Sequence, residues 1–212
     1  MRKPPQQARS RRMVERLIDA TARTIAEEGL AAATTARIAE VAGVSIGSLY
    51  QYFGDKEQLY AALLERMTAE LVMLVDQHSR QLDSQPLCDW VAGLLNAVWS
   101  GLEADQGLYL RVLRHWPQLD VLPGMDILEQ KLLSVLSLYA AQRPVPEAAA
   151  HLPARLYLLV NSVLFTLVRY ISHPSPLVSR EALIEAFSEL VARALQQRHQ
   201  DLAGREIGRA HV

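Results

Sequence analysis

The fold is decided by the stretch TTARIAEVAGVSIGSLYQYF, residues 34–53. Thr34 and Ser45 are suited to start two short helices, because their side-chain oxygens accept unpaired backbone N–H groups at a helix N-terminus. The first helix is expected at Thr35–Ala42 and the second at Ile46–Tyr52. Three residues separate them, so the pattern predicts a pair of short helices joined by one tight turn.

That turn has the composition of a helix-turn-helix. Gly43 supplies a residue that accepts a positive φ at little cost. Ile38 gives the first helix an apolar face, and Leu49 packs under the second with Phe53 at its end. In this geometry the second helix enters the major groove of DNA.

The side chains around the turn suit contacts with DNA. Serine and threonine hydroxyls hydrogen-bond phosphate oxygens, and helix N-termini offer N–H groups to anions. Gln51 matches the donor and acceptor pair of adenine, and Gly47 allows a close approach. Lys56, at the start of the next helix, is within reach of the DNA backbone. We expect DNA contacts from Thr34, Thr35, Ser45, Ile46, Gly47, Ser48, Tyr50, Gln51, Tyr52 and Lys56.

About residues 11–60, roughly a quarter of the chain, resemble the N-terminal domain of the TetR/AcrR family of transcription regulators. The combined pattern is far more specific than any of its pieces. The matching residues are Arg12, Leu17-Ile18-Asp19-Ala20, Glu28-Gly29, Thr34, Ile38-Ala39, Ala42-Gly43-Val44-Ser45, Gly47-Ser48-Leu49-Tyr50, Tyr52-Phe53 and Lys56-Glu57-Gln58-Leu59.

The resemblance implies an all-α homodimer with two DNA-reading heads, whose C-terminal helices bind a small ligand and dimerise. Most proteins of this kind are repressors. It also implies that Ile46 and Gln51 help to set the DNA sequence that is read. Backbone contacts are implied for the residues at the matching positions, Thr34, Ser45, Ser48, Tyr50, Tyr52 and Lys56.

Three residues depart from the usual pattern of the family. Ile25 stands where an aromatic residue is frequent, and Arg37 stands where an acid is frequent. Ile46 stands where a polar or basic residue is frequent. Isoleucine cannot hydrogen-bond to a base through its side chain, so we expect it to contact a thymine methyl instead.

The rest of the chain predicts helices only. No segment alternates with the period of a strand, and prolines and glycines separate the helical runs. About nine helices are expected in an all-α fold. Their ranges are Ser10–Glu28, Thr35–Ala42, Ile46–Tyr52, Lys56 to about Leu82, Pro86 to about Glu103, Asp105–Trp116, Pro123–Gln142, Pro146–Ser172 and Ser179–Arg198.

The resemblance, together with the distribution of charge, implies four segments. Residues 1–10 are expected to form a flexible basic arm suited to a polyanion, since the first twelve residues carry five arginines or lysines and no acid. The DNA-binding domain is expected at residues 11–60, and the effector-binding and dimerisation domain at 61–198. In the tail, 199–212, the end Ile207–Val212 resembles the read-through translation of a sequencing adapter, and we exclude it from fold reasoning.

A cytoplasmic bacterial location is expected, with association to the nucleoid when DNA is bound. The single cysteine, Cys88, forms no internal disulfide, which fits a reducing compartment. No apolar stretch follows the N-terminal charges, as a secretory signal would require. The most apolar run, Leu156–Val168, is thirteen residues long, shorter than the twenty or so of a membrane span, which indicates a core or interface helix.

The C-terminal part should hold the ligand and the dimer surface. The ligand candidates are residues whose side chains offer rings, charges or a buried amide: Trp99, Tyr109, Arg111, Trp116 and Asn161, with Trp90, Arg114, His115 and Arg169 as weaker ones. The apolar helices at about 152–171 and 182–195 are expected to form a four-helix interface between two subunits. The dimer would bind a palindromic operator, and a ligand would shift the helix that starts at Lys56.

Two other readings stay open at this point. Gly43-Val44-Ser45-Ile46-Gly47 matches the frame of a serine-hydrolase nucleophile, which requires a preceding strand. Alternatively, the head is vestigial and the protein is a ligand-binding module without DNA activity. The six histidines show no helical pair with an acid between them, so neither a metal enzyme nor a cofactor is expected.

Overall fold

The computed structural model describes residues 5–142 and 151–196. Within these residues it has eight α-helices, one short 3-10 helix and no strand, which confirms the all-α prediction. The helices are α1 (Pro5–Glu28), α2 (Thr35–Ala42), α3 (Ile46–Tyr50), α4 (Lys56–Ser79), α5 (Leu87–Leu113), η1 (Trp116–Gln118), α6 (Leu122–Ala141), α7 (Leu152–Ser172) and α8 (Arg180–Gln196).

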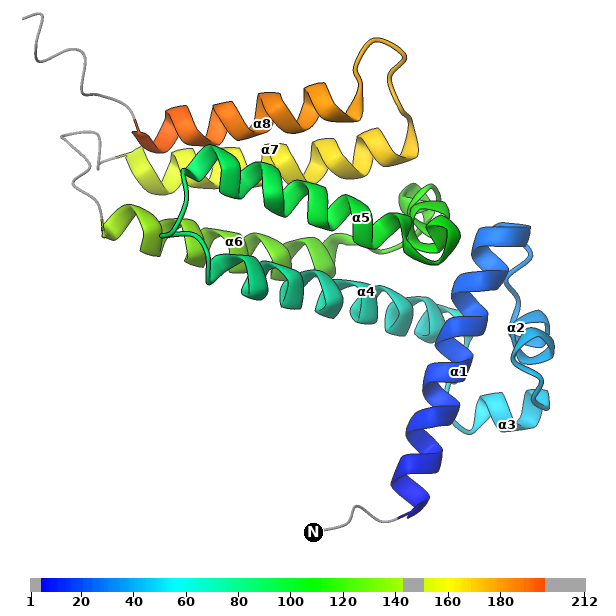
Figure 1. The fold of residues 1–212 in the computed structure, drawn as a ribbon. Helices are drawn as coiled ribbons and strands as arrows, with labels where there is room; N and C mark the ends of the chain where they lie inside the picture. Colours follow the sequence, from blue (N-terminus) through cyan, green and yellow to red (C-terminus); the bar gives the residue numbers. More distant parts are fainter. Residues whose placement is uncertain (1–4, 143–150, 197–212) are drawn as a thin grey trace, which may run out of the picture.

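The first three helices form a small head at one end of the molecule (Figure 1). α1 begins at Pro5, so the flexible arm predicted for residues 1–10 is wrong from residue 5 onward. The cause is local: proline is tolerated at the first helical position, and the glutamine, alanine and arginine residues that follow are good helix formers. Residues 1–4 lie outside the described part of the chain.

α5 contains the break that the sequence predicts after Glu103. Ala104 is extended, with ψ 159°, and the next three residues are left-handed: Asp105 has φ 48°, Gln106 φ 58° and Gly107 φ 71°. The two helices expected on either side are therefore present, joined by one left-handed turn. Two residues in that turn carry a Cβ, which costs roughly 1–2 kcal/mol each in this conformation.

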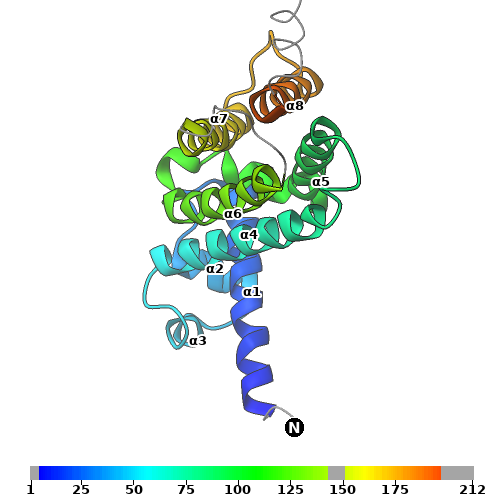
Figure 2. The same cartoon turned by 90° about the vertical axis from the view of Figure 1, so that its left-hand side faces the viewer.

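The larger body is made of α4, α5, α6, α7 and α8. α4 and α6 lie side by side, while α7 and α8 form a layer over α5 and α6 (Figure 2). One buried core fills the head and continues along α4 to Met67, and the second half of α5 joins it through Leu108 and Val112. A second core lies between α4 to α8 and is centred on Trp90 and Leu156. The head is thus packed directly onto the body.

α7 is longer and more exposed than its most apolar thirteen residues suggest. It has 21 residues and a mean hydropathy of 1.3, so by length and composition it is the one described helix able to cross a membrane. It packs against α5, α6 and α8, yet only 28% of its apolar window is buried. The core helix of a soluble protein meets the same criteria of length and composition, so the assignment of this segment as a core or interface helix stays a prediction.

The remaining differences concern helix ends. α3 stops at Tyr50 where the sequence predicts Tyr52, and α4 stops at Ser79 where it predicts Leu82. α7 begins at Leu152, and the predicted start at Pro146 lies outside the described residues. The predicted end of the last helix, at Arg198, and the whole tail from residue 199 also lie outside them.

Candidate DNA interface and ligand cavity

The helix-turn-helix is built from three local interactions. The Thr34 hydroxyl accepts the N–H of Arg37 at 3.2 Å, and the Ser45 hydroxyl accepts the N–H of Ser48 at 3.1 Å. Gly43 adopts the left-handed conformation, with φ 62° and ψ 42°. Both predicted caps and the predicted turn residue are confirmed.

Buried apolar residues fix the angle between the two short helices. Ile38 from α2 and Leu49 from α3 are fully buried in the core of the head, and Phe53 closes it behind α3. Gly43 also lies under α1, where a Cβ would come within 2.9 Å of the Arg16 guanidinium. The positive φ restricts this position to glycine, whereas the Arg16 guanidinium is the end of a flexible side chain and can move aside.

The opposite face of α3 is open to solvent. Ile46 is 45% exposed and Tyr50 is 51% exposed. Gln51 and Gly47 are exposed on the same side of the head. The exposed residues at α3 are therefore among those that the sequence predicts to contact DNA.

The polar residues of this surface are already oriented by one another. The Tyr50 hydroxyl lies 3.2 Å from the Thr35 hydroxyl, which joins α3 to the start of α2. The Ser45 and Ser48 hydroxyls are 2.8 Å apart. Such mutual contacts hold the hydroxyl groups in place on the surface. Tyr52 is different, because its ring is half-buried against the core of the head.

Asp55 positions Lys56 beside this surface. The Asp55 carboxylate accepts the Gln58 N–H at 2.8 Å and caps α4, while Gln58 Oε1 accepts the Gly54 N–H at 2.9 Å. Lys56 is exposed, and its only described ion pair is a 3.9 Å contact with Glu57. A long exposed pair of this kind contributes little to stability, so the ammonium is available to another anion.

Arg37 clamps α2 onto the end of α1. Its guanidinium donates to the Glu28 carboxylate from Nε and Nη2, at 2.9 and 2.6 Å, and pairs with Glu40 at 2.8 Å. The hydrogen bond from Arg37 is the main cause that lowers the pKa of Glu28 below its ordinary value of 4.5; burial opposes it, and the positive charge of Arg37 adds a smaller lowering effect. Arg37, which stands where the family often has an acid, is therefore paired with Glu28 of its own chain.

We expect Arg37→Met to raise the pH at which the Glu28 carboxyl titrates. A lowered folded-state pKa means that the pair stabilises the head above the unfolded value of 4.5, and that this stabilisation is lost as the pH falls through the folded value. NMR titration of the carboxyl carbon measures it. Arg193→Met, which removes a pair with Glu189 on α8, is the matched control and should leave Glu28 unchanged. The same Glu28 titration in both variants would contradict the account.

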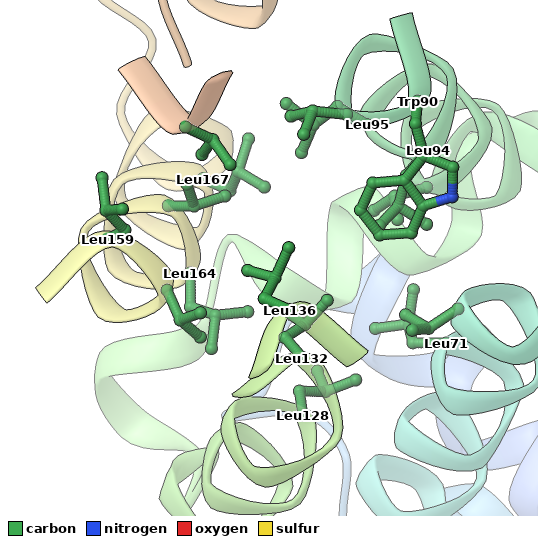
Figure 3. A pocket seen from close by; sticks show the side chains of 16 residues that line it. Leu71, Trp90, Leu94, Leu95, Leu128, Leu132, Leu136, Leu159, Leu164 and Leu167 are labelled. Atoms are coloured by element: carbon green, nitrogen blue, oxygen red, sulfur yellow. The ribbon is translucent and has the colours of Figure 1, made fainter. Parts of the chain in front are cut away.

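An apolar cavity lies inside the body. It has a volume of about 100 Å³ and is lined by residues of α4 to α8 (Figure 3). Among the side chains that line the cavity, the only polar atom is the indole nitrogen of Trp90. This nitrogen donates to the backbone oxygen of His78 at 2.8 Å and is thus already paired. The lining residues are Leu71, Val75, Trp90, Val91, Leu94, Leu95, Val98, Leu128, Leu132, Leu136, Leu159, Val160, Val163, Leu164, Leu167 and Val191.

Comparison with known proteins assigns the family. The family model described as bacterial regulatory proteins, tetR family, matches residues 17–63. The transcriptional regulator BetI of Stenotrophomonas maltophilia (strain R551-3) is 32% identical over 151 residues, which cover 66% of this chain and 73% of BetI. The chain belongs to the TetR family. It is a DNA-binding transcription regulator and not an enzyme.

Other members of the TetR family match over the head or over the fold. The nucleoid occlusion factor SlmA of Glaesserella parasuis serovar 5 (strain SH0165) is 37% identical over 59 residues, 28% of this chain and 29% of SlmA. FadR of Bacillus halodurans has the same fold, with a TM-score of 0.63 at 20% identity over 93% of this chain and 100% of FadR. SmeT, the repressor of the Stenotrophomonas maltophilia multidrug efflux pump SmeDEF, has a TM-score of 0.64 at 16% identity. The match covers 85% of this chain and 88% of SmeT.

The hydrolase frame around Ser45 has no support in a TetR-family head. The residues before it form α2, where a nucleophile elbow needs a strand. The Ser45 hydroxyl is engaged as the cap of α3 and with Ser48. Its glycine neighbours serve the turn and the exposed face of α3.

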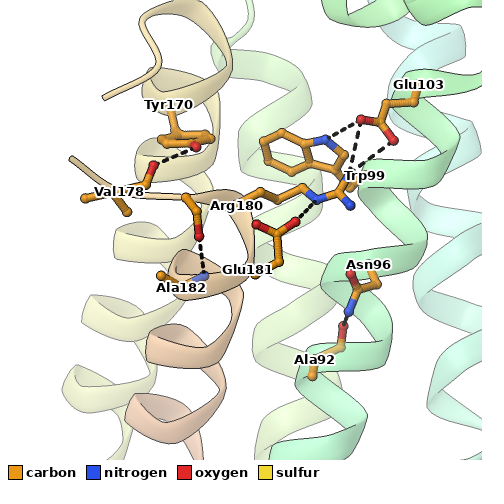
Figure 4. A network of polar contacts seen from close by, with 10 residues as sticks. Ala92, Asn96, Trp99, Glu103, Tyr170, Val178, Arg180, Glu181 and Ala182 are labelled. Carbon is orange, nitrogen blue, oxygen red and sulfur yellow. Dashed lines mark hydrogen bonds and ion pairs between the residues drawn. The ribbon is translucent and has the colours of Figure 1, made fainter. Parts of the chain in front are cut away.

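The residues proposed for the ligand site are scattered over the body. Tyr109 lines a second cavity beside the apolar one and donates to Glu70 at 3.1 Å. Trp99 packs edge-on against Tyr170, with Arg180 over its ring and Glu103 accepting its N–H (Figure 4). The Asn161 amide donates to Glu129 on α6 at 2.8 Å, so the partner of this amide is in its own chain.

Arg111 and Trp116 lie near the end of α5 and in η1, outside the apolar cavity. The Nε atom of Arg111 and the indole nitrogen of Trp116 are buried and make no described hydrogen bond. Of the weaker candidates only Trp90 lines the cavity. Leucines and valines make up the rest of the cavity lining. In the sequence these residues cannot be distinguished from those of a filled hydrophobic core.

Proposed function

We propose that the protein is a homodimeric repressor that binds a palindromic operator through the exposed face of α3 and is released from it by a small-molecule ligand. The observation that carries the proposal is the solvent-exposed face of a capped α3, on which Ile46, Tyr50 and Gln51 lie open to a partner.

We assign direct base contacts to Gln51 and Ile46, and phosphate contacts to the other residues of the surface. Gln51 offers a donor and an acceptor to adenine, and Ile46 offers a methyl group to thymine. The phosphate contacts come from exposed or half-buried hydroxyls, from backbone N–H groups and from one ammonium: Thr34, Thr35, Ser45, Gly47, Ser48, Tyr50, Tyr52 and Lys56.

The dimer forms through α7 and α8. Tyr157, Leu158 and Phe165 on α7 and Leu190 on α8 are large apolar side chains left open to solvent. Such a set on two neighbouring helices fits an isologous four-helix interface. Two heads then read two half-sites about one DNA turn apart.

The ligand binds in the apolar cavity. The solved structures with this fold include the multidrug binding protein EbrR in complex with malachite green, at a TM-score of 0.65 and 18% identity. Here α4 lines the cavity with Leu71 and Val75 and begins at Lys56 in the DNA surface, so a shift of α4 changes the spacing of the heads. By linkage, DNA must weaken ligand binding by the factor by which ligand weakens DNA binding.

The proposed domains are a DNA-binding head at residues 11–60 and an effector and dimerisation domain at 61–198. The continuity of the first core across this boundary, through Leu63 and Met67, supports mechanical coupling between the two. We place the protein in the cytoplasm and, when bound to DNA, on the nucleoid, which follows from its role as a transcription regulator.

Binding to the DNA that flanks its own coding sequence tests this function. Fluorescence anisotropy should show tight binding that weakens steeply as salt rises. Gln51→Ala should reduce the preference for operator over unrelated DNA by about 1–3 kcal/mol, because a bidentate base contact is lost. Lys56→Ala should instead weaken binding to all sequences and reduce the salt slope by about 1.

Gln130→Ala is the matched control, since Gln130 is exposed on α6 and lies outside the head. It should bind operator as the wild type does. Equal effects of Gln51→Ala and Gln130→Ala would remove the reading role of Gln51. An absence of any salt-dependent DNA binding would overturn the proposed function itself.

A further inference from the structure

Three cavities follow one another from the apolar interior to the surface beside the head. The apolar cavity shares Leu71 and Val98 with a second one of about 200 Å³. The second shares Glu70, Gly101 and Tyr109 with a third one of about 290 Å³. The shared lining residues place the three cavities next to one another, and their volumes taken together match those of small-molecule sites, about 300–1,000 Å³.

The walls of this space change from hydrocarbon to acid along its length. The second cavity is mostly aliphatic and is lined by Met67, Leu74 and Leu102 among others. The third is lined by three carboxylates, those of Asp19, Glu70 and Asp105, and by one cation, Arg66. Arg66 pairs with Asp19 at 2.6 Å and also with Glu15 at 3.3 Å, so its charge is already shared. The outer end therefore carries a net negative charge.

The outer cavity also joins the three elements that must move if a ligand is to act on the head. Asp19 lies on α1, Arg66 and Glu70 lie on α4, and Asp105 lies in the left-handed turn of α5. The Arg66–Asp19 pair bridges α1 and α4. A positive charge placed here would compete with Arg66 for Asp19 and weaken that bridge.

We propose that the effector is an amphiphilic organic cation, with its hydrocarbon part in the two inner cavities and its charged end among Asp19, Glu70 and Asp105. This rests on the proposed function, since it assigns the chemistry of the ligand that releases the DNA. A neutral apolar molecule would fill the interior but gain no electrostatic attraction from the net negative charge of the outer cavity. An anion would meet three carboxylates and a single arginine that is already engaged.

Three probes of equal chain length and different charge test the proposal: n-decyltrimethylammonium, 1-decanol and decanoate, each below its micellar concentration. Calorimetry should show the cation binding about tenfold or more tighter than decanoate, with decanol between them, and the difference should shrink as salt rises. The cation should also release operator DNA at the lowest concentration.

Two variants isolate the charge from the cavity. Glu70→Gln and Asp105→Asn remove one negative charge each; glutamine still accepts from Tyr109, and asparagine tolerates the left-handed conformation. Each should reduce the preference for the cation over decanoate severalfold and leave decanol binding unchanged. Glu65→Gln, on the same helix but outside the three cavities, is the matched control and should have no effect.

Leu95→Trp separates this inference from the proposed function, because it fills the innermost cavity and should weaken all three probes. Equal binding of the three probes, or tighter binding of decanoate, would overturn the cation assignment while the cavity remains the ligand site. Failure of all three probes to bind, with Leu95→Trp without effect, would overturn both the cation assignment and the ligand part of the proposed function.

Discussion

Leu158→Glu is expected to turn the protein from a dimer into a monomer and to weaken binding to a two-half-site operator by about a hundredfold, roughly 3 kcal/mol. Leu158 lies on the outer face of α7 and is 65% exposed. In the proposed four-helix interface it would be covered by the partner subunit, so a glutamate there would lose its hydration without gaining a cation. Sedimentation at micromolar concentration gives the mass directly.

Leu177→Glu is the control for this substitution. Leu177 is 92% exposed in the connection between α7 and α8, outside the proposed interface, so the same change in charge and size should leave the dimer intact. Circular dichroism shows whether the Leu158→Glu variant keeps its helices. We expect that it does, because Leu158 is exposed in the single subunit. A helical Leu158→Glu variant that still sediments as a dimer would contradict the proposed interface.

Trp90→Ala is expected to lower the free energy of unfolding by about 3–5 kcal/mol. Trp90 is 1% exposed at the centre of the second core and donates its N–H to His78. Alanine removes the ring and leaves the His78 carbonyl without its donor. Trp90→Phe keeps most of the volume, so the smaller loss expected for it, about 1–2 kcal/mol, reports the missing hydrogen bond.

Urea unfolding at fixed protein concentration measures both tryptophan variants, since the stability of a dimer depends on concentration. Leu138→Ala on the exposed side of α6 is the control, with an expected change within about 0.5 kcal/mol. A loss below about 1 kcal/mol for Trp90→Ala would show that Trp90 is not central to this core.

The head was predictable because its structure is set by neighbouring residues. Thr34, Gly43 and Ser45 act on backbone groups within five positions of themselves, so their roles follow from the sequence alone. The break in α5 follows in the same way from Asp105 and Gly107. The start of α1 was missed because the basic charges of the first twelve residues suggested an arm, while helix propensity decided the conformation from Pro5 onward.

The ligand cavity was not predictable, because it depends on contacts between helices that are distant in the sequence. Its walls are leucines and valines, which look like core residues in any sequence. The polar residues that stood out have partners within the chain, as Asn161 has in Glu129 and Trp99 in Glu103. The acids of the outer cavity come from α1, α4 and α5, and only the fold brings them together.

Selection of bound sequences from a pool of random duplex DNA tests the central claim most directly, that residues 34–53 read DNA in a dimer. The account predicts enrichment of an inverted repeat with half-sites about one helical turn apart. It also predicts that Gln51→Ala loses the preference at one position of each half-site while Gln130→Ala selects the wild-type sequence. Absence of any enriched sequence, or an unchanged preference in Gln51→Ala, would contradict the account.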